Sequence, residues 1–252
     1  MEKHNYKTVI VSDIHLGSRF AKVRQISDFL ASINCERLIF NGDTIDGWRI
    51  IKNNFKCWSD EYVQFIKCVL SMMQERGTIV NLLKGNHDDF FSKITPIRVG
   101  GLDIINDMVL TSGDKRYFVT HGDIFDSISC KMRWMAKLGD FLYNLLLKVN
   151  GFHNELRSRR GKSGCSYSQK VKAKVKSWVS NLSDFENKLA DMARSKGCDG
   201  IICGHIHTAK DQIINGIHYL NSGDWVETLS ALVEDFDGNW KILYYSDMFS
   251  ND

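Results

Sequence analysis

The sequence predicts an α/β fold in which a mostly parallel sheet carries helices on both faces. Short apolar runs rich in β-branched residues, which are typical of buried strands, alternate with amphipathic helical patterns between residues 8 and 83. A polar motif directly follows each of these strands. Because ligands bind beyond the carboxyl ends of the strands in such sheets, this order places the polar motifs at one common site.

The individual elements follow in chain order from their periodicity. Runs typical of strands cover residues 8–11, 37–40, 78–83, 116–120 and 200–203. Helical patterns cover residues 23–33 and 59–75, and Gly77 supplies a stop signal for the second helix. Further strands are predicted at residues 218–221, 228–233 and 240–245, the last two flanking a hairpin signal at Asp237-Gly238-Asn239. We expect these later strands to complete a second sheet packed on the first.

The segment between His121 and His205 has a different pattern and is predicted to be helical. Residues 131–149 combine a narrow polar stripe with a wide apolar face. Residues 157–176 contain eight lysines or arginines and no acidic residue, and a last helix is expected at 184–196. We therefore expect a core formed by residues 1–124 and 184–252, and a helical insertion over residues 125–183 that forms a lid over the active site.

The bulk composition indicates a soluble globular protein. The chain has 252 residues, of which 43% are hydrophobic and 25% charged, and its net charge of +3 gives no support to a nucleic-acid partner. Seven scattered cysteines without a Cys-x-x-Cys pair are typical of reduced thiols in the cytoplasm. The polar N-terminus is not typical of a signal peptide, and no run reaches the roughly 18 apolar residues of a membrane span. We expect a cytoplasmic protein that meets a membrane only peripherally.

Five polar motifs at strand ends carry the chemistry. The side chains that they offer as metal ligands are Asp13, His15, Asp43, Asn86, His121, His205 and His207. Carboxylate, imidazole and amide ligands suit Mn²⁺, Fe²⁺ or Zn²⁺. Seven ligands exceed the needs of one tetrahedral ion and suit two ions about 3.5–4 Å apart, which clamp the attacking and leaving oxygens of a phosphoryl group. Any one of these residues alone is better explained as a cap or a core polar group, so the prediction depends on the five motifs together.

These motifs, Asp-x-His, Gly-Asp, Gly-Asn-His-Asp, His-Gly and Gly-His-x-His, resemble in their order the calcineurin-like metallophosphoesterase superfamily. The resemblance covers nearly the whole chain and implies a four-layer α/β/β/α sandwich. It also implies a hydrolase with two divalent metal ions, expected to be Mn²⁺, with Fe²⁺ or Zn²⁺ as alternatives. The implied ligands are Asp13, His15 and His207 for one ion, Asn86, His121 and His205 for the other, and Asp43 as a bridge between them.

The same resemblance implies catalytic roles for His87 and Asp88. His87 would not bind metal but would face the scissile phosphate, either as a cation that stabilises the transition state or as a general acid. Asp88 would orient His87.

Three further stretches resemble the UDP-2,3-diacylglucosamine pyrophosphatase family of lipid A biosynthesis. They are residues 121–126, 199–205 and 221–227. Members of that family split a pyrophosphate into UMP and an acylated sugar phosphate and carry a helical lid. Well-known enterobacterial members place an arginine where this chain has His87, which is the commoner residue in the superfamily.

The insertion suits a nucleotide-linked lipid substrate and contact with a membrane surface. Its apolar helix face can line a chamber for acyl chains, and its basic run can hold phosphates. The alternatives are that the apolar face packs on the core and that the lysines are simply solvated. The side chains expected to contact the substrate are Asn86, His87, Asp126, Arg157, Ser168, Lys170, Lys174 and His205.

Two other functions remain open at this point. The first is a metal-dependent phosphodiesterase or phosphatase that acts on another nucleotide or phospholipid. The second is a non-catalytic binding scaffold on the same fold, for which lost metal ligands would be expected, whereas all seven are present here.

Overall fold

The structure of the protein is a computed structural model. It describes residues 3–52, 59–88, 90–91, 95–125 and 182–249. The chain divides into two compact units, one formed by Met1–Ile124 with Leu189–Asp252 and the other by Phe125–Lys188. Most of the second unit lies outside the described residues, so the helical insertion over residues 125–183 and its role as a lid stay predictions.

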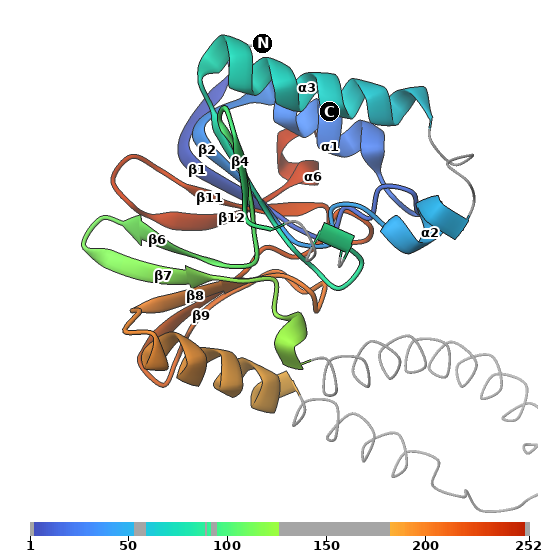
Figure 1. Cartoon of the computed structure of the whole chain (residues 1–252). Coiled ribbons are helices and arrows are strands. Elements are labelled where there is room, and N and C mark those ends of the chain that lie inside the picture. The colour runs from blue at the N-terminus through green and yellow to red at the C-terminus, as the bar shows by residue number, and fades with distance from the viewer. Residues whose placement is uncertain (1–2, 53–58, 89, 92–94, 126–181, 250–252) are drawn as a thin grey trace, which may run out of the picture. The chain divides into compact units, whose positions relative to one another are not determined.

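Two sheets form the centre of the first unit (Figure 1). The larger sheet has seven strands, which in spatial order are β12 (Trp240–Tyr244), β11 (Ser230–Glu234), β1 (His4–Val11), β2 (Ile33–Asn41), β3 (Ile79–Leu83), β5 (Leu102–Ile105) and β4 (Ile97–Val99). The smaller sheet has five, in the order β6 (Met108–Ser112), β7 (Lys115–Val119), β8 (Gly200–Cys203), β10 (Ile217–Asn221) and β9 (Lys210–Ile214). The pairs β1–β2, β2–β3, β3–β5, β7–β8 and β8–β10 are parallel, and the remaining pairs are antiparallel.

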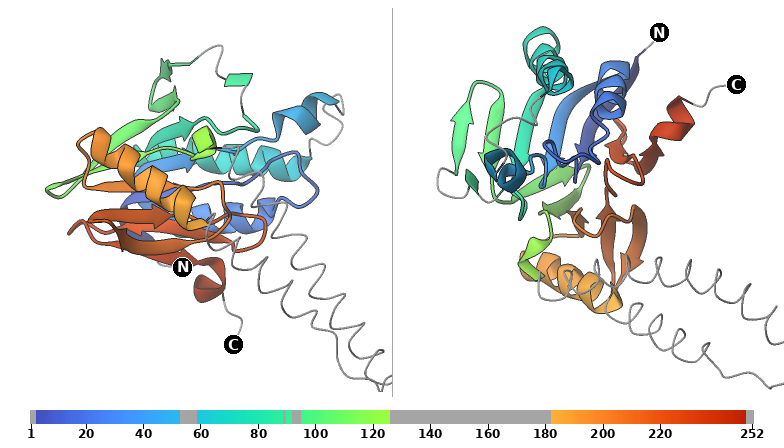
Figure 2. Two further views of the ribbon diagram at one scale, coloured as in Figure 1. Left: turned by 90° about the horizontal axis from the view of Figure 1, so that it is seen from below. Right: turned by 90° about the vertical axis from the view of Figure 1, so that its right-hand side faces the viewer.

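Helices cover the outer faces of both sheets (Figures 1 and 2). The labelled helical elements of the described residues are α1 (Val23–Ser32), α2 (Gly47–Lys52), α3 (Asp60–Arg76), the 3-10 turn η2 (Asp123–Phe125) and α6 (Tyr245–Met248). Helices α1 and α3 lie side by side on the larger sheet. A further helix spans residues 182–195, and its part within the first unit lies on the smaller sheet, where Leu189, Ala190 and Ala193 are buried. The order helix, sheet, sheet, helix confirms the predicted four-layer sandwich.

Alternation along the strands separates two hydrophobic cores. On β1, Val9 and Val11 face α1 and α3, whereas Ile10 faces the smaller sheet. Because successive side chains of a strand point to opposite faces, a strand buried on both faces must be apolar throughout, as residues 9–11 are. Helix α3 ends at Arg76 and is capped by Gly77, which has φ +69° and donates its N–H to the carbonyl of Met72, as the predicted stop requires.

The predicted strands and helices that fall on the described residues are all present, although several ends are shifted. The expected sheet membership was wrong for two of them. Only β10 joins the second sheet, whereas β11 pairs with β1 and β12 pairs with β11, which extends the first sheet. The expectation of helices on both faces of one sheet also needs correction, because the inner face of the larger sheet packs on the smaller sheet.

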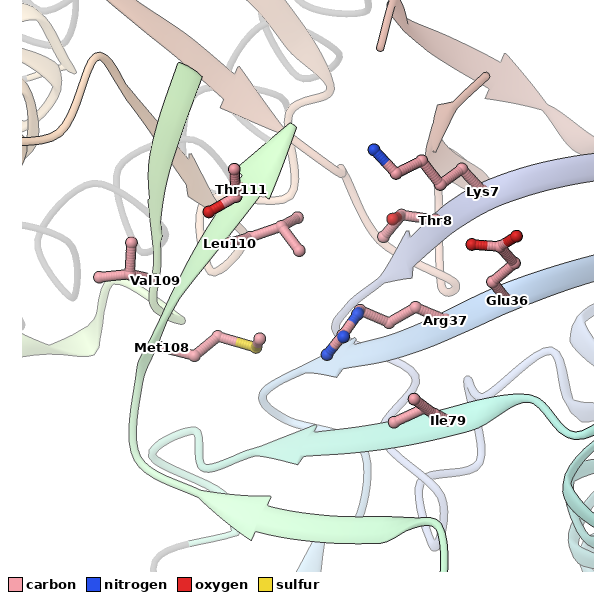
Figure 3. Close-up of a pocket in the computed structure, with 9 residues that line it drawn as sticks. All are labelled: Lys7, Thr8, Glu36, Arg37, Ile79, Met108, Val109, Leu110 and Thr111. Atoms are coloured by element: carbon pink, nitrogen blue, oxygen red, sulfur yellow. The ribbon is translucent and has the colours of Figure 1, made fainter. Parts of the chain in front are cut away.

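A cavity of about 340 Å³ lies between β6 and the inner strands of the larger sheet (Figure 3). The side chain of Arg37 extends from β2 into this space, and its Nη1 donates a hydrogen bond to Asn81 at 2.9 Å. Thr8 of β1 lines this cavity and precedes Asp13 by five residues. At the usual rise of a strand, five residues separate the two positions by about 16 Å. The cavity is therefore separate from the residues at the strand ends.

Among the described residues, no helix has both the length and the apolar character that crossing a bilayer requires.

Candidate metal centre

The seven side chains predicted as metal ligands all follow strands at their carboxyl ends. They are Asp13 and His15 after β1, Asp43 after β2, Asn86 after β3, His121 after β7, and His205 and His207 after β8. Hydrogen bonds connect the loops of the two sheets directly, since the N–H of His205 donates to Asp13 Oδ2 at 2.9 Å. The strand ends therefore meet at one edge of the sandwich, as parallel strands predict.

Five of these residues have a backbone conformation that side chains rarely adopt. The φ angles are 54° at Asp13, 54° at His15, 51° at Asp43, 70° at His205 and 55° at His207. A left-handed conformation at a residue other than glycine costs about 1–3 kcal/mol and persists only where the surrounding structure imposes it. Such strain concentrates at functional sites. Here it accompanies residues whose side chains gather in clusters of possible metal ligands.

The side chains form two clusters with the spacing of metal sites. Asp13, His15 and His207 make one, in which Nε2 of His207 lies 3.2 Å from Asp13 Oδ1 and Nε2 of His15 lies 3.9 Å from the same oxygen. Asp43, His121 and His205 make the other, in which Nε2 of His121 lies 3.5 Å from Asp43 Oδ2. The donors of each cluster all lie within 4.8 Å of one another, so each can surround one ion.

The two buried aspartates each use one oxygen for the protein and turn the other towards the histidines. Asp43 Oδ1 accepts a hydrogen bond from the N–H of His87 at 2.8 Å, whereas its Oδ2 lies 3.5, 3.8 and 4.0 Å from Nε2 of His121, His15 and His87. These distances are too long for hydrogen bonds. Asp43 Oδ2 and Asn86 Oδ1 are both buried and accept no hydrogen bond from the residues that the structure describes.

Buried oxygens without a partner need a compensating positive charge or donor. A divalent ion supplies it, and the surrounding imidazole and carboxylate donors are those that Mn²⁺, Fe²⁺ or Zn²⁺ accept. The donor set therefore fits two divalent metal ions.

Glycines make the close approach of these loops possible. A Cβ on Gly204 would lie 2.5 Å from Ser12 Oγ and 2.8 Å from Asp13 Oδ2. A Cβ on Gly85 would collide with the carboxylate and the backbone nitrogen of Asp43. Both glycines are therefore required by space, since any side chain would push a ligand loop away from the centre.

Burial and mutual charge shift the pKa values of the candidate ligands in opposite directions. Burial lowers the pKa of His15 to about 4, so its imidazole is neutral and ready to bind metal. Burial alone would also lower the pKa of His121, but the carboxylates of Asp43 and Asp13 outweigh it and raise this pKa to about 10. Burial opposes the charged form of both aspartates as well, yet the adjacent histidines hold the pKa of Asp13 and of Asp43 well below the usual range.

His87 lies beside the centre with its two ring nitrogens turned to different carboxylates. Its Nε2 is 4.0 Å from Asp43 Oδ2, and its Nδ1 is 3.5 Å from Oδ1 of the buried Asp46. Asp46 Oδ2 also pairs with Nε of Arg49 at 3.0 Å. Asp46 was not among the predicted site residues, although it is a second carboxylate three residues after Asp43 and directly before α2.

Asp88, which was expected to orient His87, has other partners. Its two oxygens accept hydrogen bonds from the backbone N–H groups of Thr44 and Ile45 at 2.9 and 2.8 Å. Burial and the adjacent charge of Asp43 raise the pKa of Asp88 to about 8. Asp88 thus holds the loop that carries Asp43, and the carboxylate beside the His87 ring is that of Asp46.

Of the side chains expected to contact the substrate, the structure places His87 and His205 in the clusters of possible metal ligands. Asn86 directly precedes His87, and its Oδ1 is buried. The others lie outside the described residues: Asp126, Arg157, Ser168, Lys170 and Lys174.

Comparison with known proteins gives a match over most of the chain. The family model described as calcineurin-like phosphoesterase matches residues 6–209. A search of curated proteins found no match.

Similar solved structures include YfcE, a phosphoesterase from E. coli, with 12% identity over 96% of this chain and 94% of that chain and a TM-score of 0.46. A novel archaeal phosphodiesterase has 13% identity over 94% of this chain and 98% of that chain and a TM-score of 0.42. Vps29 complexed with zinc, from Entamoeba histolytica, has 13% identity over 94% of this chain and 96% of that chain and a TM-score of 0.40.

Proposed function

Because the chain belongs to the calcineurin-like phosphoesterase family, we propose that its metallophosphoesterase site hydrolyses the phosphoanhydride of UDP-2,3-diacylglucosamine. The products are UMP and 2,3-diacylglucosamine 1-phosphate, as in lipid A biosynthesis. The observation that carries the hydrolase activity is the pair of clusters of possible metal ligands, in which His15 of one lies 3.8 Å from the buried Asp43 of the other. The choice of substrate is supported by the resemblance of residues 121–126, 199–205 and 221–227 to that pyrophosphatase family.

The chemistry divides between the ions and the side chains. Divalent metal ions at the centre, proposed to be Mn²⁺, supply Lewis-acid activation of the phosphoryl group and of the attacking water. Water adds to one phosphorus, and the bond from that phosphorus to the bridging oxygen breaks. His87 is close enough to the centre to stabilise the charge that develops on the phosphoryl oxygens or to give a proton to the leaving oxygen. The carboxylate of Asp46 lies behind the His87 ring, with Oδ1 3.5 Å from Nδ1.

A lipid-linked substrate places the enzyme at a membrane surface. We propose that it works in the cytoplasm, peripherally on the cytoplasmic face of the inner membrane. Binding of the substrate is assigned to the insertion, through Asp126, Arg157, Ser168, Lys170 and Lys174, together with Asn86, His87 and His205 at the centre.

The test is a product analysis with the purified protein. It is incubated with Mn²⁺ and UDP-2,3-diacylglucosamine in detergent, and the products are identified by mass spectrometry. UMP and 2,3-diacylglucosamine 1-phosphate are expected from the wild type and not from Asp43→Ala, which lacks the shared ligand. Asp237→Ala, which removes an exposed aspartate in the β11–β12 turn, is the matched control and is expected to retain activity.

One residue favours an alternative substrate, namely His87 at a position where well-known members of the pyrophosphatase family have arginine. Hydrolysis of bis-p-nitrophenyl phosphate without cleavage of the lipid would refute the proposed substrate and leave a phosphodiesterase or phosphatase for another nucleotide or phospholipid. Inactivity towards both, with metal bound, would instead indicate a binding scaffold.

A further inference from the structure

The metal centre contains a third cluster with the spacing of a metal site. His15, Asp43 and His87 present ligand atoms that all lie within 4.8 Å of one another. This cluster shares His15 with the cluster of Asp13 and His207 and shares Asp43 with the cluster around His121. The family resemblance gives His87 no part in metal binding, so the third cluster needs an explanation of its own.

His87 has the surroundings of a metal-binding histidine. Such a histidine almost always turns its second ring nitrogen to a carboxylate or a carbonyl, which fixes the ring and strengthens the ligand. His87 turns Nε2 to the centre and Nδ1 to Asp46. His121 has a similar orientation, with Nε2 turned to Asp43 and Nδ1 2.8 Å from the carbonyl oxygen of Asn41. The difference is that His87 Nδ1, 3.5 Å from Asp46 Oδ1, makes no hydrogen bond with the described residues.

His15 lies about equally far from the carboxylates of Asp13 and Asp43. Its Nε2 lies 3.9 Å from Asp13 Oδ1 and 3.8 Å from Asp43 Oδ2. Its ring centre is 4.7 Å from that of His87 and 5.7 Å from that of His207. Because Nε2 has one lone pair, it binds one ion at a time. An ion at His15 therefore lies either towards Asp13 and His207 or towards Asp43 and His87.

We propose that His87 is an alternative ligand for the ion at His15, so that the centre has two arrangements, completed by His207 or by His87. This inference rests on the metal centre of the proposed function but not on the identity of the substrate. Zinc is a suitable probe of both arrangements, because each offers two imidazoles and one carboxylate with an open position, a common zinc ligand set. In the second arrangement the lone pair of His87 is occupied, so the histidine is withheld from proton transfer and the centre is at rest.

The test measures zinc affinity in four proteins: the wild type, His87→Ala, His207→Ala and the double variant. Dissociation constants come from competition with a chromophoric chelator, and circular dichroism checks that each variant is folded. His87→Ala alone is expected to change the affinity little, because His207 still completes the site. In the His207→Ala background, removing His87 is expected to weaken zinc binding by a further factor of about 10–100, so the two changes are strongly non-additive.

Two further variants make the comparison specific to His87. His4→Ala removes an exposed histidine at the start of β1 and is expected to leave the affinity of the His207→Ala protein unchanged. Asp46→Asn keeps the His87 ring and removes the carboxylate behind it, so in the His207→Ala background it is expected to weaken zinc binding in the same direction as His87→Ala.

Additive effects of the two histidine changes, or complete loss of the ion from His207→Ala alone, would overturn the proposal. Because no substrate enters the assay, failure to cleave UDP-2,3-diacylglucosamine leaves this result unaffected.

Discussion

Replacing Gly204 by alanine tests whether the two sheets hold the metal ligands by direct contact. The added Cβ would lie 2.5 Å from Ser12 Oγ and 2.8 Å from Asp13 Oδ2, whereas ordinary contacts begin at 3.4 Å. The contact between the loops must therefore open by about 0.9 Å. Gly204 has no positive φ, so space alone decides the outcome. Forcing extra volume into such a contact destabilises a protein by about 1–3 kcal/mol.

The same movement separates His205 from Asp13, whose hydrogen bond joins the two ligand loops. A displacement of about 1 Å at a catalytic centre lowers the rate about 100-fold, which corresponds to about 2.7 kcal/mol of transition-state stabilisation. Urea unfolding measures the first effect, and kcat/KM for bis-p-nitrophenyl phosphate with Mn²⁺ measures the second.

Gly101→Ala is the matched control, because its Cβ would meet only atoms at 3.7 and 3.8 Å. We expect it to retain wild-type activity and to be equally or slightly more stable. A Gly204→Ala protein with the unfolding midpoint and kcat/KM of the wild type would refute the reasoning.

Three other perturbations probe separate groups. Asp46→Asn is expected to lower kcat about 10–100-fold at unchanged manganese content, measured by elemental analysis, because His87 loses its supporting charge; an unaltered kcat would contradict this role. Burial raises the pKa of the Cys35 thiol from 9.0 to about 12, so its contribution to stability is complete below pH 9 and is lost as the pH rises through 12. The free energy of unfolding, measured in urea, should therefore fall more between pH 9 and pH 12 for the wild type than for Cys35→Ala. Identical pH profiles of the two proteins would disprove it. With a pKa of about 10, His121 is charged at pH 7 and must release a proton when metal binds, so the calorimetric heat of Mn²⁺ binding should depend on the ionisation enthalpy of the buffer; a buffer-independent heat would argue against this.

The position of the site was predictable because one geometric rule determines it. Polar motifs after parallel strands converge at the carboxyl edge of a sheet, and the residues expected to be ligands, from Asp13 to His207, follow the strands there. The partner of His87 was not predictable in this way. Asp46 reaches that ring because the bridge between Leu16 and Ile45 and the start of α2 fix the loop after Asp43, and no periodicity records such a turn.

The sheet membership of the last strands was also beyond the sequence pattern. β11 is buried at every position, so its sequence indicates a central strand without naming its neighbour. Its pairing with β1, at Thr8 and Glu234 for example, depends on which edge of the first sheet the chain reaches after β10. The hairpin with β12 was predictable because the turn signal is local.

The hydrogen bond between Asp13 and His205 has a consequence for folding during translation. These residues are 192 positions apart, and at about 5–20 residues per second the ribosome needs about 10–40 s to add the intervening chain. For most of that time Asp13, His15 and Asp43 exist without the histidines that follow β8. The centre can thus be completed only late in synthesis, because a nascent chain that stops before β8 lacks His205 and His207 and cannot form the two clusters that contain them.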